Sequence, residues 1–114
     1  MEPQITGSAS RVVTVGSRAI GYRVFGDTSS SRTVISAHGG LVSAGDASAY
    51  DEIARDRGIR IVSPDRPGVG MSDRDPQRSI LSWGHEDVGA VLDDIGATDA
   101  VALGWSAGGQ YALA

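Results

Sequence analysis

Residues 104–108 read GWSAG, and this pentapeptide indicates the fold more directly than any other part of the chain. It has the pattern G-x-S-x-G, which is typical of a nucleophilic serine on a sharp turn between a strand and a helix. The flanking sequence suits that setting, because residues 100–104 form a short apolar run and residues 106–114 are compatible with a helix. We therefore predict a strand, a tight turn at Ser106 and a helix.

The glycines around Ser106 have a steric reason to be there. A serine held at positive φ on such a turn is strained, and bulky side chains two residues away would crowd it. We expect Gly104 and Gly108 to relieve this crowding. We also expect Gly109 to let the helix lie close to the neighbouring strands.

The composition narrows the class of protein. The chain has 114 residues, enough for one domain, and 40% are hydrophobic and 21% charged, as in a folded globular protein. The net charge is -4, and all ten basic residues are unclustered arginines, which argues against a nucleic-acid partner. No cysteine is present, and no apolar run reaches the length of a membrane span. With no signal peptide apparent, we expect a cytoplasmic protein without a membrane partner; the sequence gives no indication of its oligomeric state.

Hydrophobic patterning predicts an α/β fold, with a mostly parallel sheet and flanking helices. The first two strands, joined by a tight turn, are expected to pair antiparallel. The expected strands are residues 12–15, 19–25, 33–38, 59–63 and 100–104, and the expected helices are residues 47–57 and 80–95 and a third that begins at 106.

Two of these helices carry more detailed expectations. Asp46 is expected to cap the first, with Tyr50, Ile53 and Ala54 on its buried face. The second is expected to begin after Ser79 and to end at Gly96. Along that second helix we expect His85 to be partly buried or to lie at the edge of the apolar stripe. We also expect a solvated face made of Asp87, Asp93 and Asp94.

Two further motifs precede the pentapeptide. His38-Gly39-Gly40 follows the third expected strand, and residues 65–72, DRPGVGMS, follow the fourth. In this order, the three motifs resemble the α/β-hydrolase fold superfamily. The resemblance runs from about Arg11 to the end and covers roughly the N-terminal two-fifths of a typical member. It predicts a polar tail over residues 1–10 and, over residues 11–114, an incomplete α/β-hydrolase domain that ends in the helix after the nucleophile turn.

The resemblance implies a role for particular residues. Ser106 would be the nucleophile that attacks an acyl carbon. The backbone N–H groups of Ala107 and Gly40 would stabilise the oxyanion, with Leu41 as the adjacent alternative to Gly40. The substrate would be a small acyl compound, and neither a metal nor a cofactor is implied. The residues expected to contact the substrate are Gly39, Leu41 and Trp105.

The residues that would activate Ser106 are missing from the sequence. No Asp, Glu or His follows Ser106, whereas the resemblance implies a later acid and a later histidine base. His38 is expected to orient its loop and His85 lies on a helix, so neither is expected to act as the base. We therefore expect an N-terminal portion of a serine hydrolase that is inactive by itself. The alternatives are a non-catalytic binding module, or an acyltransferase or perhydrolase on the same fold.

Overall fold

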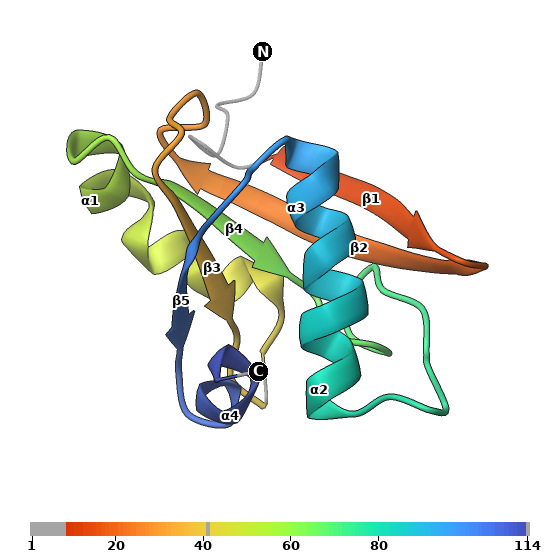
Figure 1. Cartoon of the computed structure of the whole chain (residues 1–114). Helices are drawn as coiled ribbons and strands as arrows, with labels where there is room; N and C mark the ends of the chain where they lie inside the picture. Colours follow the sequence, from red (N-terminus) through yellow and green to blue (C-terminus); the bar gives the residue numbers. More distant parts are fainter. Residues whose placement is uncertain (1–8, 41, 114) are drawn as a thin grey trace, which may run out of the picture.

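The computed structural model describes residues 9–40 and 42–113, in which strands and short helices alternate (Figure 1). The strands are β1 (Ala9–Val15), β2 (Arg18–Gly26), β3 (Thr33–Ala37), β4 (Arg60–Pro64) and β5 (Val101–Gly104). The helices are the 3₁₀-helix η1 (Ala44–Tyr50), α1 (Asp51–Asp56), α2 (Ile80–Ser82), the π-helix η2 (Trp83–Val88), α3 (Gly89–Ile95) and α4 (Gly108–Ala112). Each predicted strand and helix is present, with ends that differ by a few residues.

The strands form one sheet in the order β1-β2-β4-β3-β5. As predicted, β1 and β2 pair antiparallel; β2 also runs antiparallel to β4, whereas β3 runs parallel to both β4 and β5. The predicted α/β class is confirmed, and across the described residues the sheet is mixed, with its parallel part formed by β4, β3 and β5. The carboxyl ends of these three strands therefore lie at one edge, where sites form in open α/β sheets.

Helices cover both faces of the sheet, and each face has its own core. Alternate residues of a strand point to opposite faces, so neighbours such as Val24 and Phe25 belong to different cores. One core lies under the helix that runs from α2 to α3 and contains Ile20, Tyr22, Val24, Ile35, Ala37, Val62, Trp83 and Val91. The other lies under η1 and α1 and contains Phe25, Ala47, Ala54 and Ile61.

The helical segment 80–95 begins and ends where the sequence predicts. Ser79 caps it in a reciprocal arrangement, because the Ser82 N–H donates to Ser79 Oγ and the Ser79 N–H donates to Ser82 Oγ, both at 2.9 Å. It ends at Gly96, whose φ of +76° is the left-handed conformation that favours glycine. Of the two positions predicted for His85, partial burial is wrong, because this side chain is exposed.

Asp87 also departs from its predicted position. It is 1% exposed rather than solvated, and its Oδ1 lies 2.7 Å from Nη2 of Arg18 on β2. Asp75 and Glu86 lie 3.7 Å and 3.6 Å from the same guanidinium. Arg18 is 69 residues away in sequence, so helical periodicity alone gave no sign of this buried ion pair.

The first helical segment begins earlier than predicted. It opens as the 3₁₀-helix η1, and its N-cap is Ser43 rather than Asp46. Ala54 is buried as expected, but Tyr50 and Ile53 are exposed, so the predicted apolar face is covered only in part.

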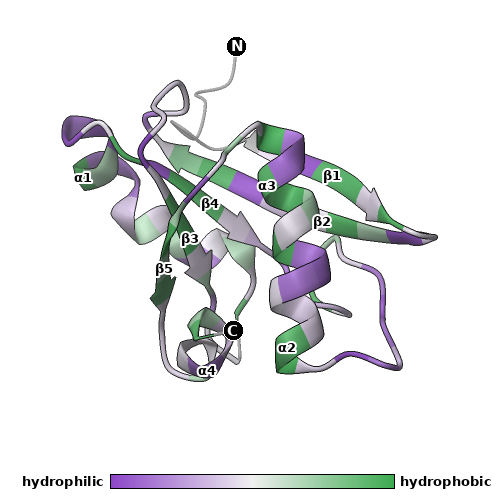
Figure 2. Cartoon of the chain, viewed as in Figure 1, coloured by the Kyte–Doolittle hydropathy of each residue, from purple (hydrophilic) through white to green (hydrophobic). Residues whose placement is uncertain are grey.

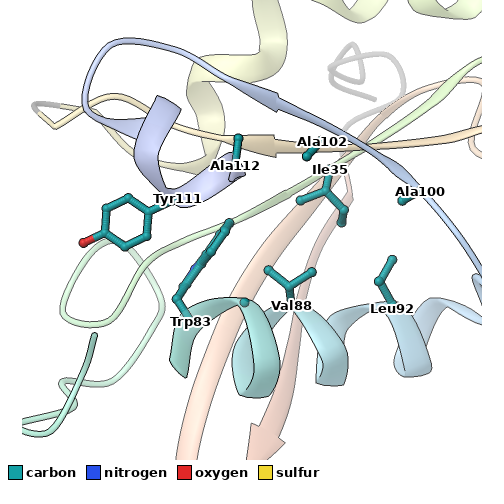
Figure 3. Close-up of a pocket in the computed structure, with 9 residues that line it drawn as sticks. Ile35, Trp83, Val88, Leu92, Ala100, Ala102, Tyr111 and Ala112 are labelled. Atoms are coloured by element: carbon teal, nitrogen blue, oxygen red, sulfur yellow. The ribbon is translucent and has the colours of Figure 1, made fainter. Parts of the chain in front are cut away.

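The strand β5 lies at the edge of the sheet and exposes apolar side chains. Val101 and Leu103 are 68% and 41% exposed, and Figure 2 shows the hydrophobic colour along this strand. On the face toward the helices, a pocket of about 180 Å³ remains between β5 and the helical segment 80–95 (Figure 3). The pocket is lined by Ile35, Trp83, Gly84, Val88, Leu92, Ala100, Ala102, Tyr111 and Ala112. An uncovered apolar edge of this kind favours association with another chain segment.

Candidate active site

The loops that follow β3 and β5 meet at the carboxyl edge of the sheet and enclose a pocket of about 270 Å³. Its lining residues are Gly39, Gly40, Val42, Trp105, Ser106 and Ala107. All of these except Val42 are residues that the sequence predicts at the site. Leu41, the remaining predicted contact, lies outside the described residues.

Ser106 occupies the strained turn that the pentapeptide predicts. Its φ is +54°, and it is the only non-glycine residue with positive φ in the described part of the chain. The Gly108 N–H donates to Trp105 O at 2.8 Å, and the Gly109 N–H donates to Ser106 O at 3.0 Å, which closes the turn into α4. The side chain of Ser106 is exposed at the pocket. Backbone strain of this kind is concentrated at functional sites.

Two of the glycines permit this turn through close backbone contacts. A Cβ on Gly104 would lie 2.6 Å from the Cα of Gly109, and a Cβ on Gly108 would lie 2.5 Å from the carbonyl oxygen of His38. Both predictions are confirmed. The prediction for Gly109 is wrong, because a Cβ there would face open space; α4 approaches the strands closely because of Gly104 and Gly108 instead.

Two backbone N–H groups at the pocket are available to an anionic ligand. Neither the Gly40 N–H nor the Ala107 N–H donates to another residue that the structure describes. The two residues are neighbours, since a Cβ on Gly40 would lie 3.4 Å from the Cβ of Ala107. Paired N–H groups beside a serine can stabilise negative charge that develops on a substrate oxygen.

Trp105 forms one wall of the pocket while remaining 63% exposed. Its Cδ1 lies 3.1 Å from the position that a Cβ on Gly39 would occupy, so the indole packs against the loop after β3. It also lines a second pocket, of about 190 Å³, together with Asp46, Ala49 and Tyr50. Trp105 therefore borders two pockets, which suits a residue that shapes access to Ser106.

The loop after β4 is held together by Asp65. Its Oδ1 accepts the Ala44 N–H at 2.7 Å, and its Oδ2 accepts the Met71 N–H at 3.1 Å. Gly70 lies against this carboxylate with φ of +53°, where a Cβ would stand 2.6 Å from the Asp65 Cγ. The Ser72 hydroxyl donates to Asp65 O at 2.6 Å. Asp65 therefore braces this loop through both carboxylate oxygens and its own backbone carbonyl.

Arg66 joins the loop after β4 to the loop after β3. Its Nη1 donates to His38 O at 2.6 Å and its Nη2 donates to Gly39 O at 3.1 Å. The Arg66 N–H also donates to Nε2 of His38, at 3.2 Å. These carbonyls lie 28 and 27 residues before Arg66 in sequence, so local sequence patterns cannot show the contacts.

His38 is buried with both ring nitrogens engaged. Because Nε2 accepts the Arg66 N–H, the proton is assigned to Nδ1, which lies 2.7 Å from Gly39 O and donates to it. Burial lowers the pKa of His38, and the Arg66 charge lowers it further against the opposing effect of the Gly39 carbonyl. A neutral ring that orients the loop fits this environment, as predicted.

Ser106 has no base beside it in the described part of the chain. Its Oγ makes no hydrogen bond there, His38 is fully occupied and His85 is exposed on a helix. The described residues also contain no cluster of three or more His, Cys, Asp or Glu side chains that could hold a metal ion. Within that same part of the chain, no helix combines the length and apolar character needed to cross a membrane.

A larger pocket, of about 460 Å³, lies at the other end of the sheet. It is lined by residues at or near the starts of β3 and β5, including Thr33 and Val101. Ser106 follows the carboxyl end of β5, so this pocket is separate from the candidate active site.

Comparison with known proteins agrees with this geometry. The model of the alpha/beta hydrolase family matches residues 34–114. No curated protein is significantly similar to the chain in sequence.

Several solved structures share the fold. Epoxide hydrolase A from Mycobacterium thermoresistibile has a TM-score of 0.73 and 24% identity over 91% of this chain and 33% of its own. A thioesterase domain from the curacin biosynthetic pathway has a TM-score of 0.74 and 19% identity, over 88% of this chain and 37% of its own. An epoxide hydrolase from Vigna radiata has a TM-score of 0.72 and 22% identity, over 92% of this chain and 34% of its own. The chain thus spans about a third of the length of these structures.

The family match covers most of the chain and includes the two loops that enclose Ser106. The sheet, the strained serine turn and the loop after β3 occur together in the order expected from the three sequence motifs. This chain belongs to the alpha/beta hydrolase family.

Proposed function

We propose that Ser106 is the nucleophile of a hydrolase that cleaves an ester, amide or similar acyl bond. The observation that carries this proposal is the positive φ of Ser106 in a pocket with two unengaged backbone N–H groups, those of Gly40 and Ala107. A strained, exposed serine next to two free donors is the arrangement that acyl transfer requires.

The reaction follows from this arrangement. The Ser106 hydroxyl loses its proton to a base as Oγ bonds to the acyl carbon, and the carbonyl oxygen becomes an oxyanion that accepts hydrogen bonds from Gly40 and Ala107. Collapse of this intermediate expels the protonated leaving group and leaves an ester on Ser106. Water then attacks the ester, which releases the acid and restores the hydroxyl.

The chemistry of serine favours acyl substrates over the epoxides that two of the structural neighbours are named for. Attack on an acyl carbon forms an ester, which water can cleave. Attack on an epoxide by the same hydroxyl would form an ether, which has no acyl carbon for water to attack and would trap Ser106 after one turnover. The thioesterase neighbour is therefore the more informative comparison for substrate class.

We further propose that the base and the acid of the reaction come from polypeptide outside these 114 residues. Two observations support this: the described residues place no base at Ser106, and the chain spans about a third of the structures that it resembles. A serine without a base reacts slowly, so the chain alone is expected to turn over little ester.

A test on the chain itself can supply the missing base from solution. Imidazole is a general base, and in its presence a fluorophosphonate probe is expected to label Ser106, as identified by peptide mass spectrometry. Labelling should disappear in Ser106→Ala and persist in Ser31→Ala, a control at an exposed loop serine. Labelling that survives Ser106→Ala would overturn the assignment of the nucleophile. Rapid Ser106-dependent ester turnover without imidazole would overturn the argument for a missing base.

Since none of the residues that the structure describes places a base beside Ser106, one alternative is a binding module that uses the same pocket without catalysis. In that case Ser106 would remain unlabelled at every imidazole concentration. An acyltransferase or perhydrolase would instead label at Ser106 and differ from a hydrolase in the acceptor that takes the acyl group.

A further inference from the structure

We propose that Arg66 is a positioning residue that aims the Gly40 N–H into the candidate active site. The proposal rests on the function proposed above, in which Gly40 is one of two oxyanion donors. Arg66 does not line the pocket, so it would act through the loop after β3 rather than on the substrate.

The orientation of the Gly40 N–H follows from the geometry of one peptide bond. The Gly39 carbonyl and the Gly40 N–H belong to the same planar unit, and no cis peptide bond occurs among the described residues. In a trans peptide these two groups point in opposite directions. Holding the Gly39 oxygen in place therefore determines where the Gly40 N–H points.

Two side chains hold the Gly39 oxygen in place. It accepts Nη2 of Arg66 at 3.1 Å and Nδ1 of His38 at 2.7 Å, both from the buried side of the loop. The N–H of Gly40 then points away from Arg66 and His38. Gly40 itself is exposed and shares the pocket with Ser106 and Ala107.

An arginine suits position 66 better than a lysine would. Arg66 is only 7% exposed, and no carboxylate in the described part of the chain forms an ion pair with it. Its planar fork spans two consecutive carbonyls, those of His38 and Gly39, which a lysine ammonium could not hold in the same way. A buried guanidinium that donates mainly to the carbonyls of one loop is well suited to hold that loop in place.

Arg66 also contacts α4, the helix that begins directly after the other donor residue, Ala107. Its guanidinium carbon lies 4.3 Å from the ring centroid of Tyr111 on α4, four residues after Ala107. Tyr111 in turn packs edge-to-face on Trp83, with 5.5 Å between ring centroids, and both line the pocket beside β5 (Figure 3). Arg66 thus contacts both the loop that carries Gly40 and the helix that begins directly after Ala107.

The direct test is the orientation of the Gly40 N–H, measured as its ¹⁵N–¹H residual dipolar coupling in the 114-residue chain. In the wild type the coupling should fit the orientation in the structure. In Arg66→Met it should change, while couplings in β2 and β4 stay the same. The control Arg78→Met, at an exposed arginine, should leave the Gly40 coupling unchanged. If Arg66→Met fails to fold, Arg66→Lys retains the charge without the fork and should show the same change.

A second measurement connects orientation to reactivity. With imidazole present, the rate of fluorophosphonate labelling at Ser106 should fall about tenfold in Arg66→Met. This is less than the 10²–10³ expected for losing a donor outright, because His38 still anchors the Gly39 oxygen.

The two measurements separate the possible failures. A Gly40 coupling that is identical in wild type and in a folded Arg66 variant would overturn the positioning role, and so would an unchanged labelling rate. If wild-type Ser106 does not label at all, the proposed function fails, and the dipolar coupling still decides whether Arg66 orients the peptide.

Discussion

Gly108 lies directly against the carbonyl oxygen of Ala37, so closely that a Cβ on Gly108 would clash with that oxygen. The contact joins the first residue of α4 to the last residue of β3. It brings the turn that carries Ser106 up to the loop that carries Gly40, and the pocket between them depends on this close approach.

Gly108→Ala is therefore expected to be severely destabilising. The new Cβ would meet backbone rather than a flexible side chain, and overpacking of this kind costs about 3 kcal/mol or more. The matched control is Gly109→Ala, where the Cβ faces open space and the gain in helix propensity is worth about 0.5–1 kcal/mol. Chemical denaturation of both variants measures the difference; equal stabilities would contradict the contact.

Ser106→Gly is expected to raise the free energy of unfolding by about 1 kcal/mol, because glycine adopts φ of +54° without the strain that serine bears there. Ser106→Ala retains the Cβ and the strain, so its stability should stay close to that of the wild type. Both variants lose the hydroxyl and so should lose labelling, but only the glycine variant also loses the backbone strain. A glycine variant no more stable than the alanine variant would show that the turn is unstrained.

Asp87→Asn should destabilise the protein by about 3 kcal/mol. The substitution keeps the size of the side chain but leaves the Arg18 guanidinium without its closest partner in a largely buried position. Asp93→Asn, on the exposed face of the same helix, should change stability by less than about 0.5 kcal/mol. Thermal unfolding of the two variants provides the comparison. A mild effect of Asp87→Asn would mean that Asp75 and Glu86 are enough to compensate the charge of Arg18.

His38 should make stability depend on pH just below neutrality. Because burial lowers the pKa of His38 in the folded state, the unfolded chain binds the proton more tightly. Stability should therefore fall as pH drops below about 6.5, by up to about 1.4 kcal/mol per pH unit, until the folded pKa is reached.

The pH dependence is measured by denaturant unfolding between about pH 5.5 and 8, above the range in which ordinary carboxylates titrate. His38→Gln should remove it, whereas His85→Gln, at an exposed histidine, should retain it. A wild-type stability that is flat over this range would show that His38 does not titrate differently on folding.

The sequence by itself predicted the order of strands and helices and the motifs that mark the site. The capped helix from Ser79 to Gly96 follows from local rules, since hydrogen bonds to nearby N–H groups and a left-handed glycine depend only on neighbouring residues. The strain at Ser106 could be predicted for the same reason, because the pentapeptide contains both the turn and the glycines that permit it.

The tertiary structure alone decided which residues distant in sequence interact. Asp87 is buried because β2 places Arg18 beside it, and helical periodicity cannot show a partner 69 residues away. Arg66 reaches the carbonyls of His38 and Gly39 because β3 and β4 run parallel, so their following loops emerge at the same edge of the sheet. Local sequence determines turns and caps, whereas the orientation of a peptide such as Gly39–Gly40 depends on hydrogen bonds that only the assembled sheet brings within reach.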